Sequence, residues 1–194
     1  MQRFDFVFYI GFVIIIALLS WKIGNLKNKI SIYSSATNER SSTLQNHFFG
    51  KTVPEFSLPY VDSKGKLNFP KRKNSSYYLL IFFTPGDCYA CFSEIPFWHE
   101  LENKFINRLK VVGVSTANSR KMLQYFIKRN EISVPTLFDE EGLLFKELGL
   151  ADSGMTPIKV LTTPKGVILH VKQTTHNNRK QQEKYLRVLD NLLP

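Results

Sequence analysis

Cys88 and Cys91 are the only two thiols of this 194-residue chain, and two residues separate them. A thiolate can attack a disulfide to form a mixed disulfide, which a second nearby thiol then resolves. A disulfide-stapled secreted domain would instead distribute more cysteines along the chain. The pair therefore predicts a single redox site, in which a reversible Cys88–Cys91 disulfide does the chemistry and no other cofactor is needed.

The cysteines stand between a predicted strand and a predicted helix. Residues 77–83 (YYLLIFF) form a continuous apolar run, which is typical of a strand buried on both faces. After the cysteines, apolar residues recur every three or four positions, as on one face of a helix: Phe92, Ile95, Trp98, Leu101 and Phe105. Because a helix amino terminus stabilises a thiolate, we predict that Cys88 is the nucleophile and Cys91, one turn further on, the resolving thiol.

Two other interpretations of the cysteine pair are weaker. A structural zinc site needs four ligands, and the histidines at positions 47, 99, 170 and 176 lack the paired spacing of a zinc motif. Two inert buried cysteines would be neighbours only by chance. We therefore predict no metal at this site.

The remaining segments predict an α/β domain. Short strands are expected at 55–58, 66–69, 109–114, 134–138, 158–161 and 167–171. Helices are expected after an N-cap at Ser119, over 141–148 and over 178–193. The inner side of the first of these is predicted to carry Met122, Leu123, Phe126 and Ile127. This order predicts a mixed central β-sheet with helices on both faces.

The first fifty residues predict a membrane anchor. Residues 6–21 carry no charge and span about 24 Å as a helix, and flanking residues lengthen the span. We divide the chain into a flank at 1–5, a transmembrane signal anchor at 6–23, a polar linker at 24–49 and a domain at 50–194. A cleaved signal peptide is the alternative, although residues 17–20 form a poor cleavage site.

Two motifs connect the domain to a known family. Residues 50–58 (GKTVPEFSL) follow the pattern G-x-x-x-P-x-F-x-L, and residues 88–96 (CYACFSEIP) follow C-x-x-C-x-x-E-x-P. Both resemble motifs of the thioredoxin-like superfamily, in its membrane-anchored TlpA/ResA-type branch. The resemblance implies a thioredoxin-like fold and thiol–disulfide exchange with protein partners.

The resemblance also implies roles for further residues. Thr156 and Pro157 fall where the family carries a cis-proline loop that docks the partner's backbone, and Pro135 is a rival for that place. Glu94 is either a partner of the helix dipole or merely exposed, and Pro96 should kink the helix. Where the family commonly has tryptophan before the first cysteine, this chain has Asp87, whose carboxylate disfavours the Cys88 thiolate.

We expect a membrane-tethered thiol–disulfide oxidoreductase whose domain is extracytoplasmic, in the periplasm. The positive charges that flank the span favour a cytoplasmic domain. The inferred redox chemistry favours an extracytoplasmic domain, and we follow the chemistry. The expected partners are protein thiols or disulfides, as in cytochrome c maturation or the maturation of another secreted enzyme, and a redox protein that supplies or accepts electrons. The net charge of +10 is scattered and accompanies no nucleic-acid module, so no nucleic acid is expected.

Two alternatives stay open on the same fold. The first is a thiol peroxidase of the peroxiredoxin type, because the P-x-F-x-L opening of this chain also resembles that of peroxiredoxins. Their peroxidatic cysteine lies in a P-x-x-x-T/S-x-x-C motif, which Thr84 and Pro85 before Cys88 do not match. Copper-handling modules use C-x-x-x-C with a distant histidine, for which His170 is the candidate in this chain.

Overall fold

The computed structural model describes residues 18, 20–22, 43–70, 76–86, 89–150, 157–174 and 178–194, and of residues 89–91 it describes the backbone alone. The chain divides into two compact units, Met1–Ser42 and Thr43–Pro194. The predicted membrane anchor at 6–23 lies almost wholly outside the described residues. No helix in the described ranges is long and apolar enough to cross a membrane.

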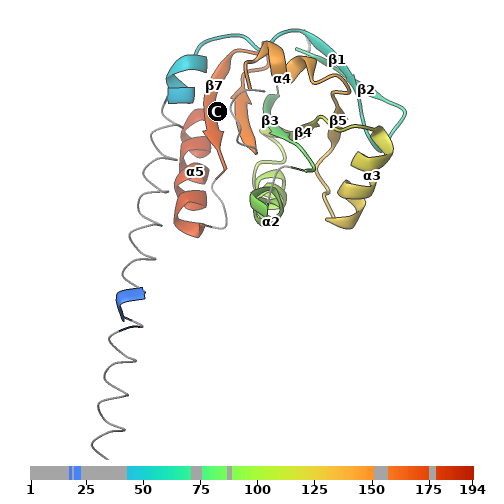
Figure 1. Cartoon of the computed structure of the whole chain (residues 1–194). Helices are drawn as coiled ribbons and strands as arrows, with labels where there is room; N and C mark the ends of the chain where they lie inside the picture. Colours follow the sequence, from blue (N-terminus) through green and yellow to red (C-terminus); the bar gives the residue numbers. More distant parts are fainter. Residues whose placement is uncertain are drawn as a thin grey trace, which may run out of the picture. The chain divides into compact units, whose positions relative to one another are not determined.

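Strands and helices of the second unit follow one another in the predicted order (Figure 1). The strands are β1 (Phe56–Pro59), β2 (Lys66–Phe69), β3 (Tyr77–Phe83), β4 (Leu109–Ser115), β5 (Thr136–Phe138), β6 (Ile158–Thr162) and β7 (Ile168–Gln173). The helices are α2 (Tyr89–Lys104), α3 (Arg120–Arg129), α4 (Leu143–Glu147) and α5 (Arg179–Leu192). The apolar patterns therefore located each element to within about two residues.

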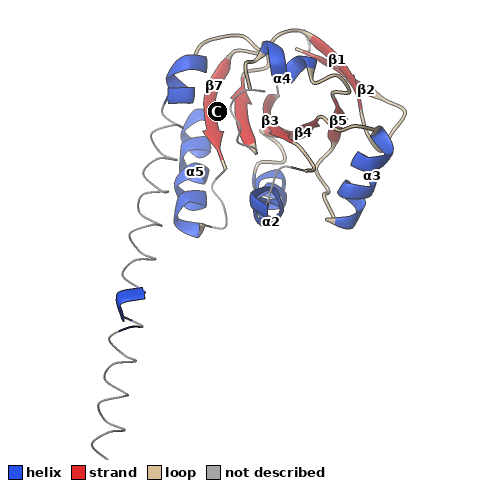
Figure 2. Cartoon of the chain, viewed as in Figure 1, coloured by secondary structure: helices blue, strands red, loops and turns tan. Residues whose placement is uncertain are grey.

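Strand β3 is the centre of a five-stranded mixed sheet with the order β5-β4-β3-β6-β7 (Figure 2). Strands β3, β4 and β5 are parallel, whereas β6 and β7 run antiparallel to their neighbours. Every residue of β3 after Tyr77 is buried, as the unbroken apolar run predicted. Strands β1 and β2 form a separate antiparallel hairpin.

Helices cover both faces of the sheet, which confirms the predicted layering. On one face, Leu79, Ile81 and Phe83 of β3 pack in a cluster with apolar residues of α2, α3 and α5. On the other face, Tyr78, Leu80 and Phe82 pack with residues of α4 and of the β1–β2 hairpin. Figure 1 shows α2 and α3 on the lower side of the sheet and α4 on the upper side. Alternate residues of β3 thus pack into two hydrophobic cores, one on each face of the sheet.

Side chains that accept hydrogen bonds from backbone N–H groups mark where helices begin. Ser119 Oγ accepts from the Met122 amide at 3.2 Å, as the predicted N-cap should. The buried Asp139 carboxylate accepts from the amides of Leu143 and Leu144, both at 3.0 Å, at the start of α4. These contacts satisfy donors that a helix end leaves without intrahelical partners.

The domain begins earlier than the predicted boundary at Gly50. Residues 43–48 are helical, and Phe48 is buried in the core beneath β7 and β2. The Gln45 side chain accepts from the Val171 amide at 2.6 Å and donates to the Leu169 carbonyl at 3.4 Å. The polar composition of 24–49 concealed this contact, because only a few side chains, Leu44, Gln45 and Phe48, anchor the segment to the core.

Candidate functional site

The thiol pair belongs to the junction between the central strand and the first long helix. Strand β3 ends at Phe83, residues 84–86 leave the sheet, and α2 begins at Tyr89, the residue directly after Cys88. Cys88 and Asp87 lie outside the described residues, and Cys91 falls in the first turn of α2, where only the backbone is described. The strand–CxxC–helix order is therefore present, while the roles of the two sulfurs stay predictions.

Pro157 lies at the same edge of the sheet as this junction. Strand β6 is antiparallel to β3, and Ile158 pairs with Phe82, so the residue before β6 stands beside the carboxyl end of β3. Pro157 is buried. The geometry of the Thr156–Pro157 bond involves Thr156, which lies outside the described residues, so the cis bond stays a prediction. Among the described residues the only cis bond is Phe69–Pro70, which excludes the rival Pro135 as a cis-proline.

Glu94 lies inside the domain, which contradicts one of the two alternatives predicted for it. Its side chain is fully buried, at 0 % exposure, so the exposed alternative is wrong. It stands in the second turn of α2, and its carboxylate faces into the domain. The alternative of a helix-dipole partner stays a prediction. Glu94 Oε2 lies 2.6 Å from Lys159 Nζ, and Thr174 Oγ1 donates to Oε1 at 3.0 Å. The indole Nε1–H of Trp98 donates to Oε2 at 3.3 Å.

Lys159 is the residue of this cluster that sequence reasoning missed. It is the second residue of β6, all five residues of which are buried, and its own side chain is 0 % exposed. A lysine is almost never fully buried unless it is paired. A single lysine in the otherwise apolar strand IKVLT was thus a signal that an acidic partner lay nearby.

The buried pair is surrounded by groups whose pKa values are shifted. The Lys159 ammonium lies 5.8 Å from the centre of the Tyr185 ring, whose hydroxyl has no hydrogen-bond partner among the described residues. Burial, with the Glu94 carboxylate adding to it, raises the pKa of Tyr185 far above its ordinary value. The His170 ring lies 5.7 Å from that of Tyr185, and burial followed by the charge of Lys172 lowers its pKa to about 4.

His170 was also the candidate copper ligand. Among the side chains that the structure describes, no three from histidine, cysteine, aspartate and glutamate gather closely enough to hold a metal ion. The side chains of Cys88 and Cys91 are not among those described. The low pKa of His170 means that its imidazole is neutral at pH 7 and packs as a half-buried ring.

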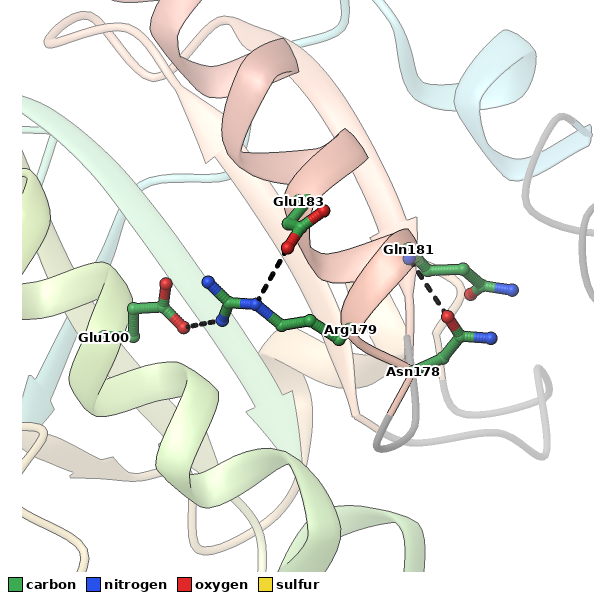
Figure 3. A network of polar contacts seen from close by, with 5 residues as sticks. All are labelled: Glu100, Asn178, Arg179, Gln181 and Glu183. Atoms are coloured by element: carbon green, nitrogen blue, oxygen red, sulfur yellow. Dashed lines mark hydrogen bonds and ion pairs between the residues drawn. The ribbon is translucent and has the colours of Figure 1, made fainter.

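Helix α2 continues through Pro96, which is exposed. The outer side of α2 is joined to α5 by ion pairs. Arg179 lies 2.6 Å from Glu100 on α2 and 3.2 Å from Glu183 on α5, as Figure 3 shows. Further along, Asp190 accepts from Lys104 and Arg108, both at 2.9 Å. These hydrogen bonds, that from Lys104 first, lower the pKa of Asp190. The helix that carries the second cysteine is thus held from inside and from outside.

Comparison with known proteins agrees with this arrangement. The thiol:disulfide interchange protein DsbE of Vibrio cholerae is 25% identical over 165 residues, which cover 84% of this chain and 85% of the relative. The crystal structure of StoA from Bacillus subtilis matches with a TM-score of 0.56 at 22% identity, over 68% of this chain and 96% of that one. A secreted disulfide oxidoreductase of Mycobacterium tuberculosis matches with a TM-score of 0.53 at 18% identity, over 68% and 91%.

The solved structures establish that the α/β fold with its mixed sheet is thioredoxin-like. The relatives include thiol–disulfide oxidoreductases, so the chain is a homologue of such enzymes. The family model described as AhpC/TSA matches residues 49–171, well over half of the sequence. The thioredoxin-like fold and the strand–CxxC–helix junction agree with this match. The chain therefore belongs to the AhpC/TSA family.

Proposed function

We propose that this chain is a thiol–disulfide oxidoreductase that exchanges electrons with protein partners through Cys88 and Cys91. The observation that carries the proposal is the junction, because the CxxC motif falls where β3 gives way to the first turn of α2. The unpaired N–H groups of a helix start stabilise a thiolate. No acidic residue lies in the first turn of α2, so the start of the helix adds no carboxylate of its own beside the thiols.

The reaction transfers two electrons and balances without a further cofactor. The Cys88 thiolate attacks one sulfur of a partner disulfide and forms a mixed disulfide, while the other partner sulfur leaves as a thiolate and takes up a proton. Cys91, as a thiolate, then attacks the Cys88 sulfur, which releases the second partner thiol and leaves the Cys88–Cys91 disulfide. The partner is reduced and the chain oxidised, and the reverse sequence oxidises a partner dithiol.

Pro157 and Glu94 are proposed to support this exchange. Pro157 stands beside the end of β3, where it can present backbone to a partner held at Cys88. Glu94 follows Cys91 by three residues in α2, a spacing at which positions share one helix face. Its charge is compensated by Lys159, so it adds little net negative charge behind the thiols. Pro96 and Thr156 keep the supporting and docking roles that the family resemblance implies, whereas Asp87 departs from the family and is expected to disfavour the Cys88 thiolate.

The proposed setting is the outer side of a membrane, with residues 6–23 as the tether. The uncharged stretch at 6–21 supports a tether, and the Mycobacterium tuberculosis homologue is described as secreted. The partners would be protein thiols that mature outside the cytoplasm, such as those of apocytochromes c, together with a redox protein that renews the active form.

Trapping tests the assignment of the two thiols. We expect Cys91→Ser in the full chain to accumulate mixed disulfides with partner proteins, because the resolving attack is lost, and Cys88→Ser to accumulate none. Non-reducing electrophoresis followed by mass spectrometry of the adducts measures this. Equal trapping by both variants, or trapping by Cys88→Ser alone, would contradict the assignment, and the absence of any two-electron thiol couple in glutathione buffers would refute the function.

A thiol peroxidase is the second candidate, because the matched family is the AhpC/TSA family. A peroxidase would consume hydrogen peroxide in the presence of dithiothreitol and lose this activity in Cys88→Ser. We expect no consumption above that of the Cys88→Ser control. The peroxiredoxin motif around the first cysteine is not matched in this chain.

A further inference from the structure

A groove runs from the thiol-bearing junction along the outer side of α3. Its volume is about 440 Å³, and the residues that line it are Pro85, Gly86, Phe92, Met122, Tyr125, Phe126, Arg129 and Asn130. Pro85 and Gly86 lead directly into the CxxC motif, and Phe92 is the residue that follows Cys91. The groove is therefore lined by residues that flank the CxxC motif on both of its sides in the sequence.

The groove is apolar where a soluble surface would usually be polar. Tyr125 is 65 % exposed, and Phe92 and Met122 are 43 % and 42 % exposed. Phe126 forms the floor, with its ring 5.4 Å from that of Phe92 and 6.1 Å from that of Phe83 in the core. Large apolar side chains that gather in a hollow, instead of being scattered, are typical of interaction sites.

The outward position of these side chains is held by polar contacts on the other side of α3. The Arg120 guanidinium donates to the carbonyl oxygens of Tyr60, Val61 and Ser63, and Gln124 Nε2 donates to the Val61 carbonyl at 2.9 Å. Leu123 and Ile127 are buried against the sheet. Helix α3 therefore cannot rotate to bury Met122 and Tyr125 without losing these contacts.

The charges that α3 carries beside the groove are all positive. Helix α3 (RKMLQYFIKR) carries four basic residues and no acidic one. Arg129 lines the groove, and no residue in the described part of the chain forms an ion pair with Arg129, Lys121 or Lys128. The surface thus combines an apolar floor with an uncompensated cationic edge, which complements an apolar and acidic ligand.

We infer that this groove binds the extended peptide segment that flanks the reactive disulfide of the partner protein, through one large apolar side chain and one carboxylate. This inference rests on the proposed function. Met122 and Arg129 are seven residues apart on α3, which corresponds to about 10 Å along the helix axis. A peptide in the extended polyproline II conformation rises about 3.1 Å per residue and has three residues per turn, so an apolar and an acidic residue three positions apart lie on one face and match this span.

Three disulfide probes and the reduced full chain test the inference. Two are nine-residue peptides whose single cysteine forms a disulfide with 2-mercaptoethanol; one has leucine and aspartate three positions apart, and the other has lysine for the aspartate. The third probe is hydroxyethyl disulfide, which is neutral and too small to fill the groove. The rate of probe reduction is measured by acid quenching and mass spectrometry.

The groove variants are the double variant Met122→Ala/Tyr125→Ala and the single variant Arg129→Glu. The matched control is Leu143→Ala on α4, at the other face of the sheet. It truncates an apolar side chain that is 52 % exposed. We expect the double variant to slow both peptides by about tenfold, because apolar anchors dominate binding. Arg129→Glu should reverse a preference for the acidic peptide of about threefold. The hydroxyethyl disulfide rate should stay within about twofold for every variant.

Several outcomes would overturn the inference. Peptide rates that do not change in the groove variants, or that change equally in Leu143→Ala, would mean that the groove binds no peptide. An equal fall in the hydroxyethyl disulfide rate would mean that the residues act on the thiols and not on docking. A change from dimer to monomer in sedimentation of the double variant would mean that a second copy occupies the groove. A parent protein that reduces none of the probes refutes the proposed function itself.

Discussion

Helix α2 is held to the C-terminal half of the domain by two kinds of ion pair that differ in their surroundings. Inside, Glu94 and Lys159 are completely buried, and two further donors, from Thr174 and Trp98, satisfy the carboxylate. Outside, Arg179 joins Glu100 and Glu183 with a side chain that is 59 % exposed (Figure 3). The geometry is similar, because both closest N···O distances are 2.6 Å. The comparison teaches that burial, and not distance, decides what such a pair does for stability.

The largest effect is expected from breaking the inner pair. Lys159→Met leaves the Glu94 carboxylate buried without its cation, so the free energy of unfolding should fall by about 3–5 kcal/mol. Urea denaturation followed by circular dichroism measures the loss. The double variant Glu94→Gln/Lys159→Met removes both charges and should regain most of it. A single variant as stable as the parent would show that the buried pair is not a structural requirement.

An intermediate effect is expected from His170, which lies beside Tyr185 in the same region. Its pKa of about 4 in the folded chain is below the ordinary value of 6.5, so between these pH values the unfolded chain binds a proton that the folded chain does not. The resulting stability is fully present above pH 6.5 and is lost as the pH falls toward 4. Since the ring is half-buried, we expect a slope below about 1.4 kcal/mol per pH unit.

His170→Phe keeps a ring in this place and removes the titration. Urea denaturation at several pH values between 4 and 7 should give a shallower decline for the variant than for the parent. Identical slopes would mean that His170 titrates alike in the folded and unfolded chains.

The smallest effect is expected at the surface network. Arg179→Gln removes both outer ion pairs of that residue, and we expect the denaturation midpoint at physiological salt to stay within experimental error, because water and salt screen exposed charges. Any loss at low ionic strength should vanish near 1 M salt, where the screening length is about 3 Å. A salt-independent loss comparable to that of Lys159→Met would abolish the distinction between the two kinds of pair.

The fold was predictable because its signals are local. The apolar run at 77–83 and the Ser119 cap each specify their element from neighbouring residues alone. The CxxC motif could likewise be placed at a strand–helix junction. Information about partners distant in sequence was absent, and the pair of Glu94 with Lys159 joins residues 65 positions apart.

The orientation of α3 could be predicted only in part. Leu123, Phe126 and Ile127 are buried as the helical spacing predicted, but Met122, placed on the same inner side, faces outward. Spacing identifies the centre of an apolar face and not its width, which depends on what packs against it. Phe92 shows the same limit, since it continues the apolar face of α2 and is nevertheless exposed at the groove.

The clasp that Arg120 makes on the turn after β1 has a consequence for how this protein could diversify. Three carbonyl oxygens of residues 60–63 converge on one guanidinium, so the hairpin tip and the first turn of α3 shift as a single body. Lengthening or shortening that tip would therefore tilt the helix that lines the groove while leaving the redox motif untouched. Evolution could in this way change partner choice through a loop beside the edge strand β5, without altering the electron chemistry.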